Sequence, residues 1–128
     1  MSKRCFVMMP FAKSFDGVWL SIIRPTVLAS GHNCLRADDI SVPGSILDDL
    51  FKSIKEADYL IADLTGRNAN VFYELGYAHA LNKPVILLTQ DVSDIPFDLR
   101  HQRLIAYSDS MAGGAALQVA LKKYIDSL

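Results

Sequence analysis

The sequence lacks several features that would each assign it to a class of protein. No apolar run approaches the roughly 18 residues of a membrane-spanning helix. Its 13 basic residues are balanced by 14 acidic ones, so no positive excess is available for a nucleic-acid backbone. It has no G-x-x-x-x-G-K-[ST] loop, which argues against generic phosphoryl transfer. The cysteines show no metal-ligand spacing such as C-x-x-C. We therefore expect no membrane, nucleic acid polymer, metal or cofactor.

What remains has the composition of an ordinary soluble domain. The 128 residues are 51% hydrophobic and 21% charged, which suits one domain with a core of its own. The segment Met1–Arg4 lacks the apolar stretch and small-residue cleavage site of a signal peptide. Cys5 and Cys34 both lie in apolar runs, as buried free thiols do in a reducing compartment. These features predict a cytoplasmic protein.

Short apolar runs alternate along the chain with helical patterns. We expect strands at residues 5–9, 32–37, 59–64, 85–88 and 104–107. Helices are expected at residues 15–29, with a kink or short break at Pro25, then at 46–54, 71–81 and from about 113 to 125. This alternation predicts right-handed crossovers and a parallel sheet. The expected fold is α/β: a single-domain flavodoxin-like (Rossmann-like) three-layer sandwich with a five-stranded parallel sheet of order 2-1-3-4-5.

The loop after the third strand is the most promising site. In an α/β sheet of this order, ligands bind beyond the carboxyl ends of the first and third strands, where the order reverses. That edge brings together the segment Asp63–Asn70 and four residues after the first strand, Met8, Met9, Pro10 and Phe11. Glu74 follows, and we expect it in the first turn of the third helix, where unpaired N–H groups favour a carboxylate.

From spacing alone, Glu74 has two interpretations that both stay open. Most acids in a first helical turn only complement the helix dipole, and a few belong to a binding site. A capping box is a poor fit, because the candidate caps Asn68 and Asn70 stand six and four residues before Glu74.

Three segments carry a resemblance to a known family. Asp58–Thr65, Asn70–Ala78 and Lys83–Val85 resemble the nucleoside 2-deoxyribosyltransferase superfamily. The Met-Met-Pro-Phe loop and the segment Arg36–Asp38 resemble a TIR-like branch of it, described as predicted nucleotide-binding proteins. The resemblance extends to about Tyr107, so that residues 1–128 would form one nucleoside 2-deoxyribosyltransferase-like domain.

The resemblance implies N-glycosidic chemistry on a small-molecule nucleoside or nucleotide. In the family, the glutamate that matches Glu74 attacks the anomeric carbon of the sugar. The base departs, and the glycosyl-enzyme passes the sugar to another base or to water. Related enzymes often complete their pocket from a neighbouring subunit, so the resemblance also implies a homo-oligomer, a dimer or larger.

The sequence departs from the family at two acidic positions. An aspartate on the helix before the third strand aligns with Leu50, which has Asp49 beside it. A second family acid aligns with Asn68, whose amide forms hydrogen bonds but cannot protonate a leaving base. Asp63 is available as a substitute acid or sugar ligand. The candidate catalytic residues are therefore Glu74, Asp63 and Asp49.

The remaining candidates each have a structural alternative. Met8 and Met9 either line an apolar slot for a base or fill the core, and Pro10 and Phe11 follow them. Asn70 is a helix cap, a ribose ligand or both. Thr65 and Gly66 could hold a phosphate beside the helix. The expected nucleoside-binding residues are Met8, Met9, Pro10, Phe11, Thr65, Gly66, Asn68 and Asn70.

Two functions are consistent with these residues. The first is an enzyme that cleaves or transfers the N-glycosidic bond through a glycosyl-enzyme on Glu74. The second is a TIR-like nucleotide- or NAD-binding signalling module without turnover, or an NAD glycohydrolase. Glu74 favours the first, and the departures at the acidic positions keep the second open.

Overall fold

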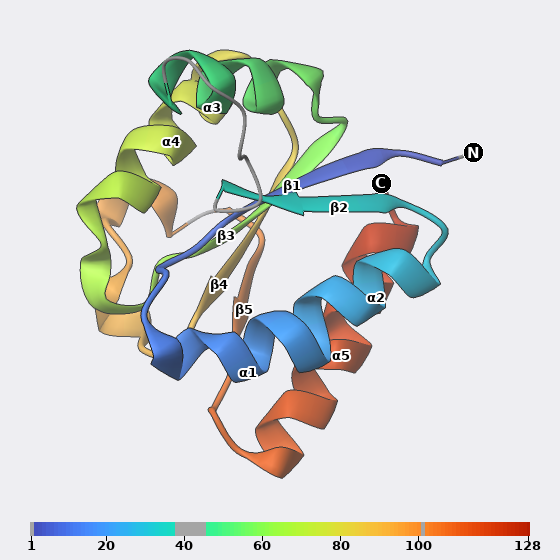
Figure 1. Ribbon diagram of the computed structural model, residues 1–128. Coiled ribbons are helices and arrows are strands. Elements are labelled where there is room, and N and C mark those ends of the chain that lie inside the picture. Colours follow the sequence, from blue (N-terminus) through green and yellow to red (C-terminus); the bar gives the residue numbers. More distant parts are fainter. Residues whose placement is uncertain (1, 38–45, 101) are drawn as a thin grey trace.

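A parallel sheet of five strands forms the centre of the molecule, in the order β2-β1-β3-β4-β5 (Figure 1). The computed structural model describes residues 2–37, 46–100 and 102–128. The order confirms the prediction from the alternating pattern. The strands are β1 (Arg4–Met8), β2 (Asn33–Arg36), β3 (Tyr59–Asp63), β4 (Val85–Thr89) and β5 (Leu104–Ala106).

Helices cover both faces of the sheet, as Figure 1 shows. On one face, α1 (Asp16–Val18), α2 (Arg24–Ala29) and α5 (Met111–Asp126) pack over side chains such as Val7 and Ile61. On the other face lie α3 (Ile46–Glu56) and α4 (Ala69–Ala80). Because β3 is central and covered on both faces, all five of its residues are buried.

The helical segment that follows β1 continues past Pro25 without a break. A π-helical turn, Trp19–Ile23, joins α1 directly to α2, in which Pro25 is the second residue. Proline has no N–H to donate to the preceding turn, and a wider turn beside it accommodates that missing hydrogen bond. The predicted distortion is therefore present as a π-helical turn rather than as an interruption.

Two helices begin earlier than the sequence pattern indicated, because a side chain caps each of them. Asn68 accepts hydrogen bonds from the backbone N–H groups of Asn70 and Val71, so α4 starts at Ala69. Ser110 likewise accepts from the N–H of Gly113, so α5 starts at Met111. The new start of α4 changes the position of Glu74 within the helix.

Two further features bear on the expected class of protein. Cys5 and Cys34 are free and stand opposite each other on β1 and β2, Cys5 buried and Cys34 half-buried. Among residues 2–37, 46–100 and 102–128, no helix combines the length and the apolar character of a membrane span.

Candidate active site

A cavity of about 620 Å³ opens at the carboxyl ends of β1 and β3, where the strand order reverses. It lies between the loop after β1, the first turns of α3 and the first turns of α4. Its lining is mostly apolar, with a few polar groups, as in a typical small-molecule site. The lining residues are Met9, Pro10, Phe11, Ala37, Leu47, Leu50, Asn68, Asn70, Val71, Tyr73 and Glu74.

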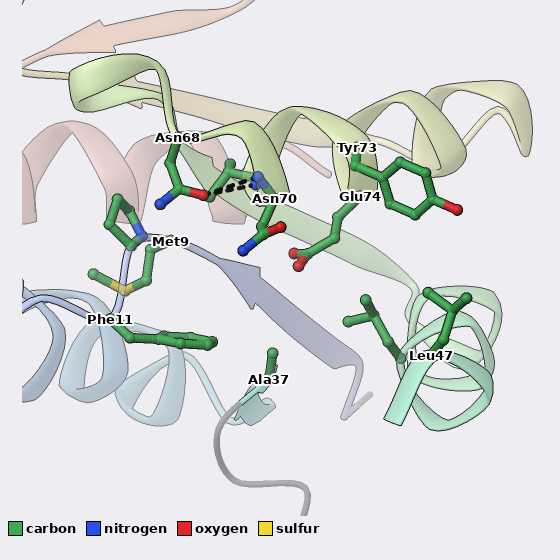
Figure 2. A pocket seen from close by; sticks show the side chains of 11 residues that line it. Met9, Phe11, Ala37, Leu47, Asn68, Asn70, Tyr73 and Glu74 are labelled. Atoms are coloured by element: carbon green, nitrogen blue, oxygen red, sulfur yellow. Dashed lines mark hydrogen bonds between the residues drawn. The ribbon is translucent and has the colours of Figure 1, made fainter. Parts of the chain in front are cut away.

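The polar groups of the cavity come from one wall, formed by α4. Asn70 and Glu74 are four residues apart and so share a face of the helix. Figure 2 shows the amide of Asn70 and the carboxylate of Glu74 pointing into the cavity side by side. Asn68 lies at the start of the same wall, where its side-chain oxygen caps the helix. Of its two expected roles, Asn70 therefore does not serve as the cap.

Glu74 is in the second turn of α4, and the expectation of a first-turn position is wrong. Because Asn68 starts the helix at Ala69, the first turn contains no acid, and the dipole argument does not apply to Glu74. Its side chain is only 8% exposed. Among the described residues, no donor hydrogen-bonds to its carboxylate. Burial raises the pKa of Glu74 to about 7.

The opposite wall is apolar and comes from the end of β1. The Phe11 ring faces Asn70 and Glu74 across the cavity in Figure 2, and Met9 also contributes to the lining. Met8, by contrast, is fully buried among core side chains on the face covered by α3 and α4 and is outside the cavity lining. Of the two interpretations of Met8, the structure shows core packing.

Asp63 occupies a different environment at the end of β3. Its carboxylate accepts hydrogen bonds from the backbone N–H and the hydroxyl of Thr65 and from the hydroxyl of Tyr107. Gln90 extends the network by donating to the oxygens of Thr65 and Tyr107. Burial raises the pKa of Asp63, while the hydrogen bonds from Thr65 and Tyr107 act to lower it. The network joins the ends of β3, β4 and β5, outside the lining of the Glu74 cavity.

The other expected residues lie beside the cavity. Asp49 is half-buried on α3, which lines the cavity through Leu47 and Leu50 instead. Thr65 and Gly66 border a neighbouring hollow of about 400 Å³ that shares only Pro10 and Asn68 with the Glu74 cavity.

The backbone N–H of Gly66 is already hydrogen-bonded within the protein. Its N–H donates to Asp94, and its φ of 77° is a left-handed conformation that favours glycine. Arg67, which follows, pairs with the same Asp94 carboxylate at 3.7 Å. The Gly66 N–H and the Arg67 side chain therefore hold the loop to the segment after β4. These are the groups that a bound phosphate would contact.

Some residues of the cavity and of the Asp63 network were not predicted from the sequence. Leu47, Tyr73 and Ala37 line the cavity, and Tyr73 stands next to Glu74 in the motif, which was the available signal. Tyr107 is 44 residues from the Asp63 that it contacts, so no local pattern indicated it. Within the described residues, no group of three His, Cys, Asp or Glu side chains could hold a metal ion.

The family of the chain follows from its sequence. The family model described as nucleoside 2-deoxyribosyltransferase matches residues 28–126, more than half of the chain and including α4 with Glu74. The chain belongs to this family. No curated protein gives a significant match to this family member.

Solved structures agree with this family at the level of the fold. The 2-deoxyribosyltransferase of Bacillus psychrosaccharolyticus is 16% identical, with 94% of this chain and 91% of that one covered and a TM-score of 0.72. The 2-desoxiribosyltransferase of Leishmania mexicana is 20% identical, with 92% of this chain and 97% of that one covered and a TM-score of 0.66. The CMP N-glycosidase of Clostridium botulinum is 21% identical, with 95% of this chain and 99% of that one covered and a TM-score of 0.73. Nearly the whole of each domain is therefore shared.

Proposed function

We propose that this protein cleaves or transfers the N-glycosidic bond of a nucleoside or nucleotide, with Glu74 as the nucleophile. The observation that carries the proposal is the buried Glu74 carboxylate, which faces a cavity at the strand-order reversal and has no hydrogen-bond donor among the described residues. Membership of the deoxyribosyltransferase family supports it. The names of two structural neighbours, a 2-deoxyribosyltransferase and a CMP N-glycosidase, give the same reaction class.

The chemistry requires the ionised form of Glu74. A carboxylate oxygen attacks the anomeric carbon, the carbon–nitrogen bond breaks, and its electron pair leaves with the base. The base takes up a proton from solvent or from a second acid. The ester to Glu74 is then cleaved by a second base, in a transferase, or by water, in a hydrolase. Because burial raises the pKa of Glu74 to about 7, about half of the molecules carry the anion at neutral pH.

The Asn70 amide, which points into the cavity beside Glu74, suits the hydroxyl groups of a sugar. Met9 and Phe11 on the opposite wall suit the flat faces of a base. Leu47 and Tyr73 expose apolar surface at the cavity, 45% and 59% exposed, which supports a homo-oligomer in which a second copy covers it. We place this enzyme in the cytoplasm, as the composition predicts.

One observation favours binding without turnover, the TIR-like alternative that includes NAD as a ligand. Neither Asp63 nor Asp49 lines the cavity, so neither candidate acid stands where it would protonate a leaving base. A module that only holds a nucleotide needs no such acid.

Chromatography of a reaction mixture separates these functions. The purified protein is incubated with 2′-deoxynucleosides, ribonucleosides, nucleoside 5′-monophosphates and NAD, with and without a free acceptor base. A free base released in the absence of acceptor identifies a hydrolase, and a new nucleoside formed only with acceptor identifies a transferase. Shifts in melting temperature with no product in any mixture would support the binding module.

The variant Glu74→Gln keeps the shape of the side chain and removes its nucleophilic charge. We expect it to lower product formation by at least about a thousandfold, as the loss of a nucleophile does in other covalent enzymes. The chain offers a matched control in Glu56→Gln, because Glu56 is the only other glutamate and is exposed on α3. Equal activity of the Glu74→Gln and Glu56→Gln proteins would exclude the mechanism.

A further inference from the structure

Phe11 has an unusual position for an aromatic residue. It lies in the loop after β1, lines the cavity and is 55% exposed. Figure 2 shows its ring flat along the wall that faces Asn70 and Glu74. A phenylalanine ring with half of its surface in solvent is not held by core packing, so its orientation must come from a neighbouring group.

That neighbour is Arg36, the last residue of β2. Its guanidinium carbon lies over the Phe11 ring, 5.5 Å from the ring centroid, and over the Trp19 ring, 4.8 Å from that centroid. Both distances are within the range of cation–π attraction. Arg36 and Trp19 are buried, 6% and 4% exposed, and neither lines the cavity. The guanidinium therefore supports Phe11 from the side that a ligand does not reach.

The three side chains form a column from the core to the cavity. Trp19 belongs to the π-helical turn and packs in the main core, which fixes the inner end. Arg36 is fixed by its strand, which pairs with β1 through Val7. A planar guanidinium stacks on an aromatic face in a way that an ammonium group cannot. Phe11 is thus held as a rigid surface by groups that stay out of the site.

We propose that Arg36 is a positioning residue, which holds Phe11 flat so that the base of the ligand stacks on the ring and thereby sets affinity for the base. This inference rests on the proposed function for the identity of the ligand, a molecule with a nucleobase. It assigns Arg36 to binding and not to the glycosidic step, because no atom of Arg36 reaches the cavity.

Trp19 provides a direct readout of this column. It is the only tryptophan in the sequence, so the intrinsic tryptophan emission of the protein comes from a ring 4.8 Å from the Arg36 guanidinium. A base that stacks on Phe11 changes the surroundings of the cation behind the ring, so we expect the Trp19 emission to change although the ligand does not touch Trp19.

The experiment uses the full chain with Glu74→Gln as background, so that no ligand is consumed. The probes are 2′-deoxyadenosine, 2′-deoxycytidine, cytidine 5′-monophosphate and NAD, titrated by Trp19 emission and by calorimetry. At least one probe is expected to give a saturable emission change. Adding Arg36→Met should weaken its binding between about threefold and thirtyfold. Arg36→Lys should restore part of the affinity, because it keeps the cation without the planar stack.

A matched control is Arg24→Met, since Arg24 is exposed at the start of α2 and its loss changes the net charge equally. It should leave binding within about twofold. Phe11→Leu should weaken binding as Arg36→Met does, and the two changes together should do little more than either one, because Arg36 acts through Phe11. In the protein with Glu74 intact, Arg36→Met should raise KM and leave kcat within about twofold, since lost ground-state binding raises KM alone.

The proposal is overturned if no probe changes Trp19 emission, if Arg24→Met and Arg36→Met weaken binding equally, or if the Phe11 and Arg36 effects are additive. Should Arg36→Met fail to fold, Arg36→Lys is compared with Phe11→Leu instead. The proposal is contradicted if Arg36→Lys weakens binding as much in the Phe11→Leu protein as it does in the protein with Phe11. Failure of the proposed function is recognised separately. In that case the protein with Glu74 intact releases no base, while the binding pattern of the Arg36 variants is retained.

Discussion

The two buried carboxyl groups near the carboxyl edge of the sheet differ in what surrounds them. Asp63, at the end of β3, is fully buried, and three donor groups from Thr65 and Tyr107 bind it. Glu74, on α4, is 8% exposed, and no donor among the described residues binds it. Burial raises the pKa of both groups. Only for Asp63 do hydrogen bonds act against that rise.

The contrast shows which of the two carboxylates has lone pairs that the protein does not use. The lone pairs of Asp63 are used by the protein, which ties the ends of neighbouring strands together. The lone pairs of Glu74 face a cavity and are left for a ligand. A carboxylate that is desolvated without compensation destabilises the fold, and such groups are concentrated where function requires them. Asp63 therefore contributes to structure, and Glu74 is retained at a cost to stability.

The largest expected effect is that cost, seen as a pH dependence of stability. Burial raises the pKa of Glu74 in the folded state to about 7, above its ordinary value of 4.5, so the folded protein binds this proton more tightly than the unfolded chain does. Hence the contribution to the free energy of unfolding falls as pH rises from about 4.5 to about 7, by roughly 3 kcal/mol. Urea denaturation of the parent and of Glu74→Gln, at pH 4 and pH 8, measures it.

Glu74→Gln should remove this component, because glutamine does not titrate. The variant should match the parent at pH 4 and exceed its stability at pH 8. The contrary result would be a parent that is less stable at pH 4 than at pH 8, with Glu74→Gln showing the same change in stability between the two pH values. It would show that Glu74 ionises in the folded state as it does in water.

The second expected effect concerns the reaction. If the Glu74 anion is the nucleophile, kcat/KM follows the ionised fraction of the free enzyme. With a pKa of about 7, kcat/KM should rise roughly fiftyfold between pH 5 and pH 7 and level off above that. Rates of base release across this range test it, with folding monitored at each pH. A profile that is flat from pH 5 to pH 7 would contradict the raised pKa.

The third expected effect tests the paired acid. Asp63→Ala leaves the Thr65 and Tyr107 donors without their acceptor, and Tyr107 is itself buried. We expect a loss of about 2 kcal/mol in the free energy of unfolding. Base release per folded molecule should fall less than tenfold, because Asp63 lies outside the cavity lining.

The control for this change is Asp98→Ala, which removes an exposed acid and should alter stability by less than about 0.5 kcal/mol. The opposite pattern, in which Asp63→Ala removes activity and leaves stability unchanged, would indicate that Asp63 takes part in the reaction. It would also end the contrast with Glu74.

Much of this arrangement could be predicted because it depends on local patterns. Apolar runs such as Tyr59–Leu64 and the alternation with helices were enough for the strand order, and the order placed the loop after β1 beside the loop after β3. The family motif around Glu74 then indicated this residue as the candidate nucleophile. Each of these steps uses neighbours in the sequence or a rule of topology.

The remainder depended on contacts between distant residues. Tyr107 donates a hydrogen bond to Asp63, and Arg36 lies over the ring of Phe11; neither pairing leaves a periodic signal in the sequence. The position of Glu74 was missed by one turn for a local reason, because Asn68 and Asn70 were both plausible caps and only the geometry selects Asn68. Asp38, which belongs to the segment that resembles the TIR-like branch, lies outside the described residues.

The smallest expected effect concerns Asn68, which borders both the Glu74 cavity and the hollow beside Thr65. Its side-chain oxygen binds the N–H groups of Asn70 and Val71. Asn68→Ala removes this cap and should cost about 1 kcal/mol, whereas Asn68→Asp keeps an acceptor there and should cost little. Urea denaturation of the two variants measures the difference. If the cap also sets where α4 begins, the alanine variant should lose more kcat/KM than its stability loss explains, because Glu74 shifts with the helix. Equal destabilisation by alanine and aspartate would instead assign the contribution of Asn68 to its NH₂ group.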